Sequence, residues 1–172
     1  KKSLLLFFLL VAMQVFAQRD TDHWFAPMVE RQSIGTNNQN LYLSTDVTTP
    51  FDVNIYSNAN FTTPIATVTG LSKGNPKTVV IPKANIVTTG NPSAEIFNTN
   101  CKMGIFVKGA SPFFARLGIT SSTTHAEIVT SKGRAGLGNE FFSVNTEMYY
   151  DSTVANFMTS IMATEDNTKV TV

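Results

Sequence analysis

The sequence predicts an all-β domain, an antiparallel β-sandwich or a closely related sheet assembly. Short runs of β-branched and aromatic residues recur along the chain, bounded by clusters of Gly, Pro, Asn and Ser. Beyond the N-terminus no segment has the 3.6-residue apolar period of an amphipathic helix, so the crossovers of a parallel sheet are not predicted. A sandwich of short antiparallel strands accounts for both observations. Part of a larger repeated β-assembly is the alternative.

The first 17 residues have the pattern of a secretory signal peptide. Lys1 and Lys2 precede the apolar run SLLLFFLLVAM, and Val15 and Ala17 give the small-residue geometry for cleavage before Gln18. The run is shorter than the roughly 20 residues that a membrane span needs. We therefore expect a signal-peptide helix, contact with the export machinery and a secreted or cell-surface location, with a buried N-terminal helix as the alternative.

Residues 18–172 are expected to form one domain whose strands can be followed in order. NLYLST at Asn40–Thr45 and FDVNIYS at Phe51–Ser57 alternate with period two, which is typical of strands with one buried face. The same reasoning predicts further strands at Thr78–Pro82, Met103–Gly109, Pro112–Ile119, Ala126–Ser131, Glu140–Val144 and Phe157–Thr164.

The last residues, TEDNTKVTV, predict a turn followed by a short strand. Asp166 and Asn167 have side chains that bond to their own backbone and tolerate left-handed conformations, so they favour a reversal after Thr164. Lys169–Val172 would then pair back onto Phe157–Thr164 as an edge strand. A calcium loop is the alternative, but the D-x-D-x-D-G pattern is absent.

The composition excludes some classes of partner. Charged residues make up 15% of the chain, with 13 Lys plus Arg against 12 Asp plus Glu. Such a balanced surface has no electrostatic footprint for nucleic acid or for an anionic membrane. Cys101 is the only cysteine, so no intramolecular disulfide can form, and we expect it to be a small buried hydrophobe.

Three groups of polar residues are of the types found in metal or catalytic sites. Asp20, Asp22 and His23 could begin a metal site, but they would need further ligands, so a solvated segment is expected. His125 lies near several Ser and Thr residues and Glu127, yet no G-x-S-x-G elbow accompanies it. Glu127 and Glu140 could in principle act as a glycosidase pair, which keeps a secreted hydrolase as an alternative.

The glycines of KGRAGLGNEFF do not form a phosphate-binding motif. Gly133, Gly136 and Gly138 match neither the Walker A pattern nor the dinucleotide fingerprint, so we expect them to supply turns between two strands. We therefore predict no catalytic residue, no metal ligand and no cofactor.

Trp24 is the one candidate ligand-binding residue. It is the only tryptophan, and it is expected to be either a core anchor of the first strand or a platform on which a sugar stacks. Asn60-Phe61-Thr62 is a formal N-glycosylation sequon, which requires an exposed loop.

Several motifs in this order resemble one known family. GIFVKGASPFFARLG, AEIVTSKGRAGLGNEFFSV and FMTSIMATEDNTKVTV together are similar to the N-terminal domain of the IgGFc-binding-protein family. Leu137, Gly138, Glu140 and Phe141 match its K-G-x-x-x-L-G-x-E-F/Y step, and Ala163–Val172 match its A-T-E-D-N-T-x-V-T-V step. TDHWFAPM resembles the family opening T-D-F-W-x-A-F, with His23 where the family has an aromatic residue.

The resemblance implies a function outside the cell. Bacterial members of the family are typically large cell-surface proteins of Bacteroidota, often exported by the type IX secretion system, and some have gliding-motility-associated sorting regions. The family region continues past the TEDNT motif, so the chain is expected to be the N-terminal part of a longer protein. We expect a non-catalytic binding or adhesion domain with a glycan or protein ligand; a purely structural spacer is a further alternative.

Overall fold

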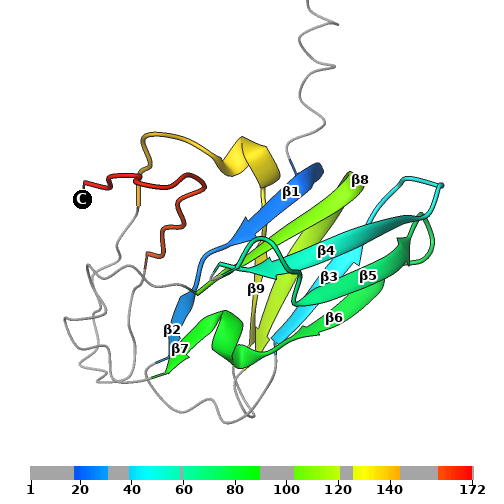
Figure 1. The fold of residues 1–172 in the computed structure, drawn as a ribbon, viewed down its shortest axis with the longest axis horizontal. Helices are drawn as coiled ribbons and strands as arrows, with labels where there is room; N and C mark the ends of the chain where they lie inside the picture. Colours follow the sequence, from blue (N-terminus) through cyan, green and yellow to red (C-terminus); the bar gives the residue numbers. More distant parts are fainter. Residues whose placement is uncertain are drawn as a thin grey trace, which may run out of the picture.

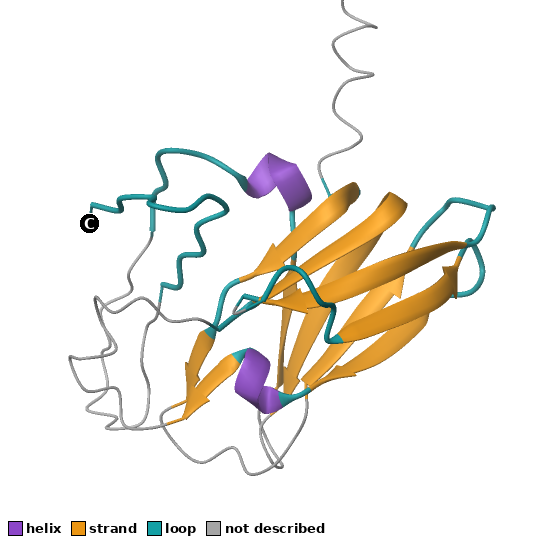
Figure 2. Cartoon of the chain, viewed as in Figure 1, coloured by secondary structure: helices purple, strands orange, loops and turns teal. Residues whose placement is uncertain are grey.

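The computed structural model describes residues 18–30, 39–58, 60–89, 103–120, 126–143 and 159–171 (Figure 1). The signal peptide predicted for residues 1–17 lies outside them. Strands dominate and the helices are single 3-10 turns (Figure 2), which confirms the all-β class. The elements are β1 (Asp20–Phe25), β2 (Met28–Glu30), β3 (Gln39–Ser44), β4 (Phe51–Ser57), β5 (Ala66–Leu71), β6 (Lys77–Ile81), η1 (Lys83–Asn85), β7 (Val87–Thr89), β8 (Ile105–Thr120), β9 (Ala126–Thr130) and η2 (Gly133–Gly136).

Two antiparallel layers share the long strand β8. The first half of β8 pairs with β4 and β1, and β5 pairs with β4, so this layer has the order β5-β4-β8-β1. We call it the β4 layer. The second half of β8 pairs with β3 and β9, and β6 pairs with β3, which gives a β3 layer with the order β6-β3-β8-β9. Figure 1 shows β1, β8, β4 and β5 side by side. The short strands β2 and β7 form a separate parallel pair.

The hydrophobic core lies between the two layers. Alternate residues of β8 point inward along its whole length, and the buried residues of β3 and β4 also alternate with more exposed ones. The core therefore consists mainly of the inward faces of β3, β4 and β8, with further residues from β1, β5, β6 and the segment after η1. Its buried members are Phe25, Leu41, Leu43, Phe51, Val53, Ile55, Val68, Leu71, Ile81, Ile86, Ile105, Val107, Phe113, Ala115, Leu117 and Ile119.

The predicted strand boundaries hold in some places and fail in others. The strand at Phe51–Ser57 is found with the predicted bounds, and those near Asn40–Thr45, Thr78–Pro82 and Ala126–Ser131 are found within a residue or two. The division at Pro112 was wrong, because β8 is one strand of 16 residues. Strands β1, β2, β5 and β7 were not predicted with their bounds.

The predicted strand at Glu140–Val144 was wrong over its described residues. Residues 140–143 have no regular structure, and Phe141 and Phe142 are 68% and 92% exposed. Gly133 has a φ of +59°, as a turn glycine should, but Gly136 and Gly138 do not have positive φ. The glycine segment thus forms a helical turn and an extended run rather than a link to a second strand.

The C-terminal prediction was half right. Residues 164–167 form the expected turn, Asn167 has the left-handed φ of 61°, and the Thr168 hydroxyl donates to the Glu165 carbonyl oxygen over 2.8 Å. Residues 159–163 and 168–171 are not strands, so the predicted edge hairpin was wrong over these residues. The turn residues fix a local reversal, but a ladder needs neighbouring apolar faces that this exposed tail does not bury.

Candidate functional site

Three aromatic side chains form a row on the outer face of the β4 layer. Trp24 on β1 lies opposite Phe106 on β8, and Phe106 lies opposite Tyr56 on β4. The ring centroids of Trp24 and Phe106 are 5.3 Å apart with an interplanar angle of 24°, and those of Tyr56 and Phe106 are 5.9 Å apart at 26°. We call these three residues the aromatic row. Their neighbours in sequence point into the core, so the strand alternation places the row outside.

Phe61 extends the aromatic row from the loop between β4 and β5. Its ring meets Phe106 edge to face with the centroids 6.1 Å apart, and 53% of its surface is exposed. The loop is shaped by Asn60, whose side-chain oxygen accepts hydrogen bonds from the backbone N–H groups of Thr62 and Thr63 and from the Thr62 hydroxyl. All three rings of the row are partly exposed. The protein thus keeps four aromatic rings at its surface instead of in its core.

A second row of side chains runs beside the aromatic row. Four residues lie opposite one another on adjacent strands: Asp22 on β1, Lys108 on β8, Asn54 on β4 and Thr67 on β5. The first three are each two residues away from a member of the aromatic row on the same strand, and Thr67 continues the line onto β5. We call these four residues the polar row. Two residues along a strand correspond to about 7 Å, so one small ligand can touch both rows.

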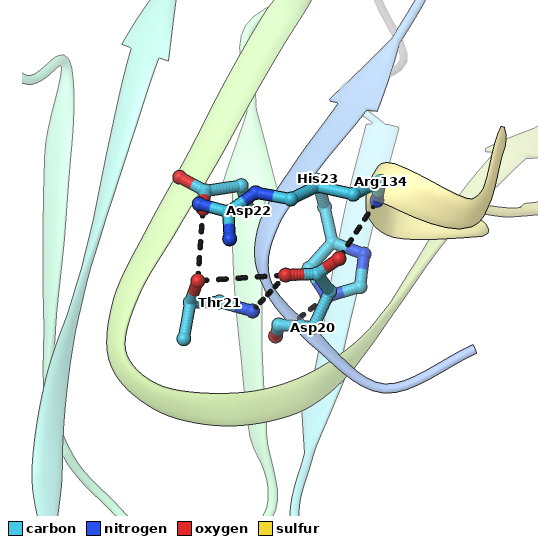
Figure 3. A network of polar contacts seen from close by, with 5 residues as sticks. All are labelled: Asp20, Thr21, Asp22, His23 and Arg134. Carbon is cyan, nitrogen blue, oxygen red and sulfur yellow. Dashed lines mark hydrogen bonds and ion pairs between the residues drawn. The ribbon is translucent and has the colours of Figure 1, made fainter. Parts of the chain in front are cut away.

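A network of polar contacts ties β1 to η2 (Figure 3). The Asp20 carboxylate accepts hydrogen bonds from the backbone N–H groups of Thr21 over 2.7 Å and of Arg134 over 2.8 Å. The Asp22 carboxylate accepts one from the Thr21 hydroxyl over 2.8 Å and forms an ion pair with the Arg134 guanidinium. We call Asp20, Thr21, Asp22 and Arg134 the latch.

The latch changes the acidity of Asp20. Burial alone would raise the pKa of this carboxyl group, but the hydrogen bonds from three backbone N–H groups and the charge of Arg134 outweigh it and hold the pKa below its usual value. Gly133 permits the close approach, because a Cβ atom there would lie 2.4 Å from the Asp20 Cβ atom.

His23 lies beneath the latch and is fully buried, so the expectation of a solvated segment was wrong. Its Nε2 atom lies 3.1 Å from the Asp20 carbonyl oxygen and 2.9 Å from the Phe113 carbonyl oxygen. Two acceptors require a proton on Nε2, which leaves Nδ1 unprotonated, and Nδ1 is buried with no partner among the described residues. Burial lowers the pKa of His23, although the two carbonyl groups and the charges of Asp20 and Asp22 partly oppose this.

The residues singled out in the sequence have different places in the fold. Trp24 is on the first strand, as expected, but it faces outward and is not a core residue. Asp20, Asp22 and His23 are brought together with Arg134, but nowhere in the described part of the chain are three His, Cys, Asp or Glu side chains placed so that they could hold a metal ion. Glu140 lies in the exposed segment after η2.

Other candidates lie outside the described residues. These are Cys101, His125 and the side chain of Glu127, whose backbone belongs to β9. Phe106 and Tyr56 were not predicted as ligand-binding residues. The alternation in FDVNIYS places Tyr56 on the outer face, and that in IFVKG could have done the same for Phe106, but only the strand register shows that both meet Trp24.

Comparison of the chain with protein-family models, with curated proteins and with solved structures gave no match. In the part of the chain that the structure describes, no helix is both long and apolar enough to cross a membrane. The aromatic row, the polar row and the latch are therefore the features that bear on function.

Proposed function

We propose that this chain is a non-catalytic, extracellular binding domain that takes a glycan on the outer face of the β4 layer. The observation that carries the proposal is the aromatic row of Trp24, Phe106 and Tyr56 at the surface. The signal-peptide pattern of residues 1–17 supports a secreted or cell-surface location. The resemblance to the IgGFc-binding-protein family supports adhesion as the role, within a larger surface protein of the Bacteroidota type.

The chemistry of the two rows suits a sugar. A pyranose has an apolar C–H face and a rim of hydroxyl groups. Partly exposed aromatic rings gain free energy by covering the apolar face, and an adjacent row of polar side chains can bond to the rim. Rings on three adjacent strands extend over about 10 Å, which is long enough for more than one sugar unit.

The balance of the remaining surface supports the same class of ligand. The charged fraction is 15%, and Asn, Thr and Ser supply much of the polarity. Hydroxyl and amide groups make adaptable hydrogen bonds with neutral polar partners. A protein ligand is the second possible partner, because exposed aromatic residues also anchor protein interfaces.

The experiment is a glycan array on the chain expressed in full, followed by calorimetric titration of the strongest binder. Trp24→Ala should weaken binding roughly tenfold or more, because about 1.4 kcal/mol of lost stacking corresponds to a factor of ten. Tyr42→Ala is the matched control. Tyr42 is an aromatic residue of β3 that is 43% exposed on the other layer, so its removal should leave the affinity unchanged.

Three results would count against the proposal. These are a native chain that binds no glycan, a Trp24→Ala variant that binds like the native chain, and equal losses in the Trp24 and Tyr42 variants. Thermal unfolding of each variant shows whether the fold has been kept. If the chain binds a protein but no glycan, the ligand of this face is a protein and the proposed glycan ligand is wrong.

A further inference from the structure

Two acceptor atoms of the polar row already have partners within the protein. The side-chain oxygen of Asn54 accepts a hydrogen bond from the Thr67 hydroxyl over 2.8 Å. Asp22 is only 4% exposed, and its Oδ2 atom accepts a hydrogen bond from the Thr21 hydroxyl and forms the ion pair with Arg134. Contacts within the protein therefore take up part of the acceptor capacity of the row.

The donors of the polar row remain available. Because Thr67 occupies the oxygen of Asn54, the amide nitrogen of Asn54 is the end of this side chain that is left for a ligand. Lys108 is exposed and lies between Asp22 and Asn54 in the register. Within the described ranges no carboxylate lies at ion-pair distance from its ammonium group. Lys108 and Asn54 thus lie opposite each other on adjacent strands, and the ammonium group and the amide nitrogen are both donors.

Asp52 limits where the anionic group of a ligand can lie on this face. Asp52 is exposed and lies on β4 two residues from Asn54, on the side away from Tyr56. One of its carboxylate oxygens accepts the backbone N–H of Gly70 over 3.1 Å, which holds this side chain at the sheet. An anionic group would be repelled near Asp52 and attracted between Lys108 and the aromatic row.

From this arrangement we infer that the preferred ligand is an acidic glycan, whose carboxylate or sulfate group is bound by the Lys108 ammonium and the Asn54 amide nitrogen while its sugar ring packs on the aromatic row. The inference rests on the proposed function and specifies the ligand class. It assigns two roles: the aromatic row supplies affinity for sugar rings in general, and Lys108 and Asn54 select a charged one.

The test compares charged and neutral forms of the same oligosaccharide. An array of neutral, uronate-containing and sulfated oligosaccharides identifies the strongest binder, and titration then compares it with its methyl ester or desulfated form at low and high salt. The charged form should bind about tenfold tighter or more, as a charge-assisted hydrogen bond is lost with the charge. The preference should shrink at high salt.

Three variants separate Lys108 from a general charge effect. Lys108→Gln should remove most of the preference for the charged form. Lys73→Gln, which changes an exposed lysine in the turn after β5, should keep it. Asp52→Asn should raise the affinity for the charged form, because it removes an exposed repelling carboxylate from the same face of the layer.

The outcomes distinguish this inference from the proposed function. Neutral glycans bound through Trp24, with no effect of Lys108→Gln, would overturn the acidic ligand and leave the glycan-binding domain. Equal affinity for the charged oligosaccharide and its neutral form would do the same. A native chain that binds no glycan at all would overturn both. A preference for the charged form that is lost in Lys108→Gln and kept in Lys73→Gln would support the inference.

Discussion

At Gly109 in β8, the rings of two core residues take up the space that a side chain would need. A Cβ atom at Gly109 would lie 2.8 Å from Cε1 of Phe113 and 3.2 Å from Cε2 of Phe51. Phe113 is fully buried, and the ring of His23 packs against it edge to face with the centroids 4.6 Å apart. The Phe113 ring therefore has no open space into which it can move, and Gly109→Ala should destabilise the domain.

The magnitude follows from two opposing terms. Gly109 does not have a positive φ, so alanine can adopt its backbone conformation and should gain about 0.4–1 kcal/mol through the lower entropy of the unfolded chain. Forcing an extra carbon into a packed core costs about 1–3 kcal/mol, and the enclosed ring places this site in the upper part of that range. The net loss in the free energy of unfolding should be about 1–2 kcal/mol.

Gly118→Ala is the matched control. It is the same substitution in the same strand, and its Cβ atom would lie 2.8 Å from Cε2 of Tyr42. Tyr42 is 43% exposed on the outer face of the β3 layer, so its ring can swing toward solvent. Urea unfolding followed by fluorescence or circular dichroism should show a change of no more than about 0.5 kcal/mol for this control.

Two results would refute the reasoning about Gly109. The first is a Gly109→Ala variant that is as stable as the native protein or more stable. The second is an equal loss in the Gly109 and Gly118 variants, which would mean that the core rings are not the cause. A double variant with Phe113→Leu should lose less than the sum of the two single variants, because the smaller side chain leaves room for the new methyl group.

Three further predictions concern β1 and its latch. The free energy of unfolding should fall as the pH drops below about 6.5, because His23 binds a proton more readily in the unfolded chain than in the fold. It should fall again below about 3.8, because the same holds for Asp20. Urea midpoints between pH 8 and 3 measure both effects, and a His23→Gln variant whose stability has an unchanged pH dependence near pH 6 would contradict the first. Gly133→Ala should lower the free energy of unfolding by about 2 kcal/mol or more, because alanine would have to adopt a left-handed φ of +59° and its Cβ atom would lie 2.4 Å from the Asp20 Cβ atom. Amide hydrogen exchange should accelerate in β1 more than in β3. Equal acceleration in both strands would argue against a local effect. Arg134→Gln should lower the free energy of unfolding by about 1 kcal/mol. The loss is smaller than for a fully buried ion pair, because the side chain of Arg134 is 64% exposed although that of Asp22 is only 6% exposed. A thermal midpoint equal to that of the native chain would show that the ion pair contributes nothing to stability.

The sequence predicted the strands that obey simple alternation. In FDVNIYS every second residue is buried, so β4 could be placed with its bounds. In β8 the same period continues through Pro112, but Gly109 and Pro112 look like the ends of two strands. The strand tolerates both because its pairings are interrupted here. The pairing with β4 ends at Gly109 and that with β3 begins at Phe114, and the register of β1 shifts between Lys108 and Phe113. A proline between two partners removes no ladder hydrogen bond.

The candidate site was harder to predict for a different reason. DTDHWF does not resemble a strand with one apolar face, since its buried residues include Asp22 and His23. The partners that make their burial possible, Arg134 and the Phe113 carbonyl, lie about 90 to 110 residues later in the chain. A pattern within a short window cannot contain this information. Trp24 could be chosen as a candidate, but its aromatic neighbours depend on the register of three strands.

The polar composition of β1 is itself an argument for function. A valine or isoleucine in place of His23 would satisfy the core face without a buried nitrogen that has no partner among the described residues, and an apolar strand would not need the latch. Natural sequences depart from such local rules mainly where a site has to be positioned. The bonds of the latch are directional, and they fix the segment from Asp20 to Asp22, two residues before Trp24. The latch thus holds the backbone just before Trp24, which is the rigidity that the proposed sugar-binding surface would require.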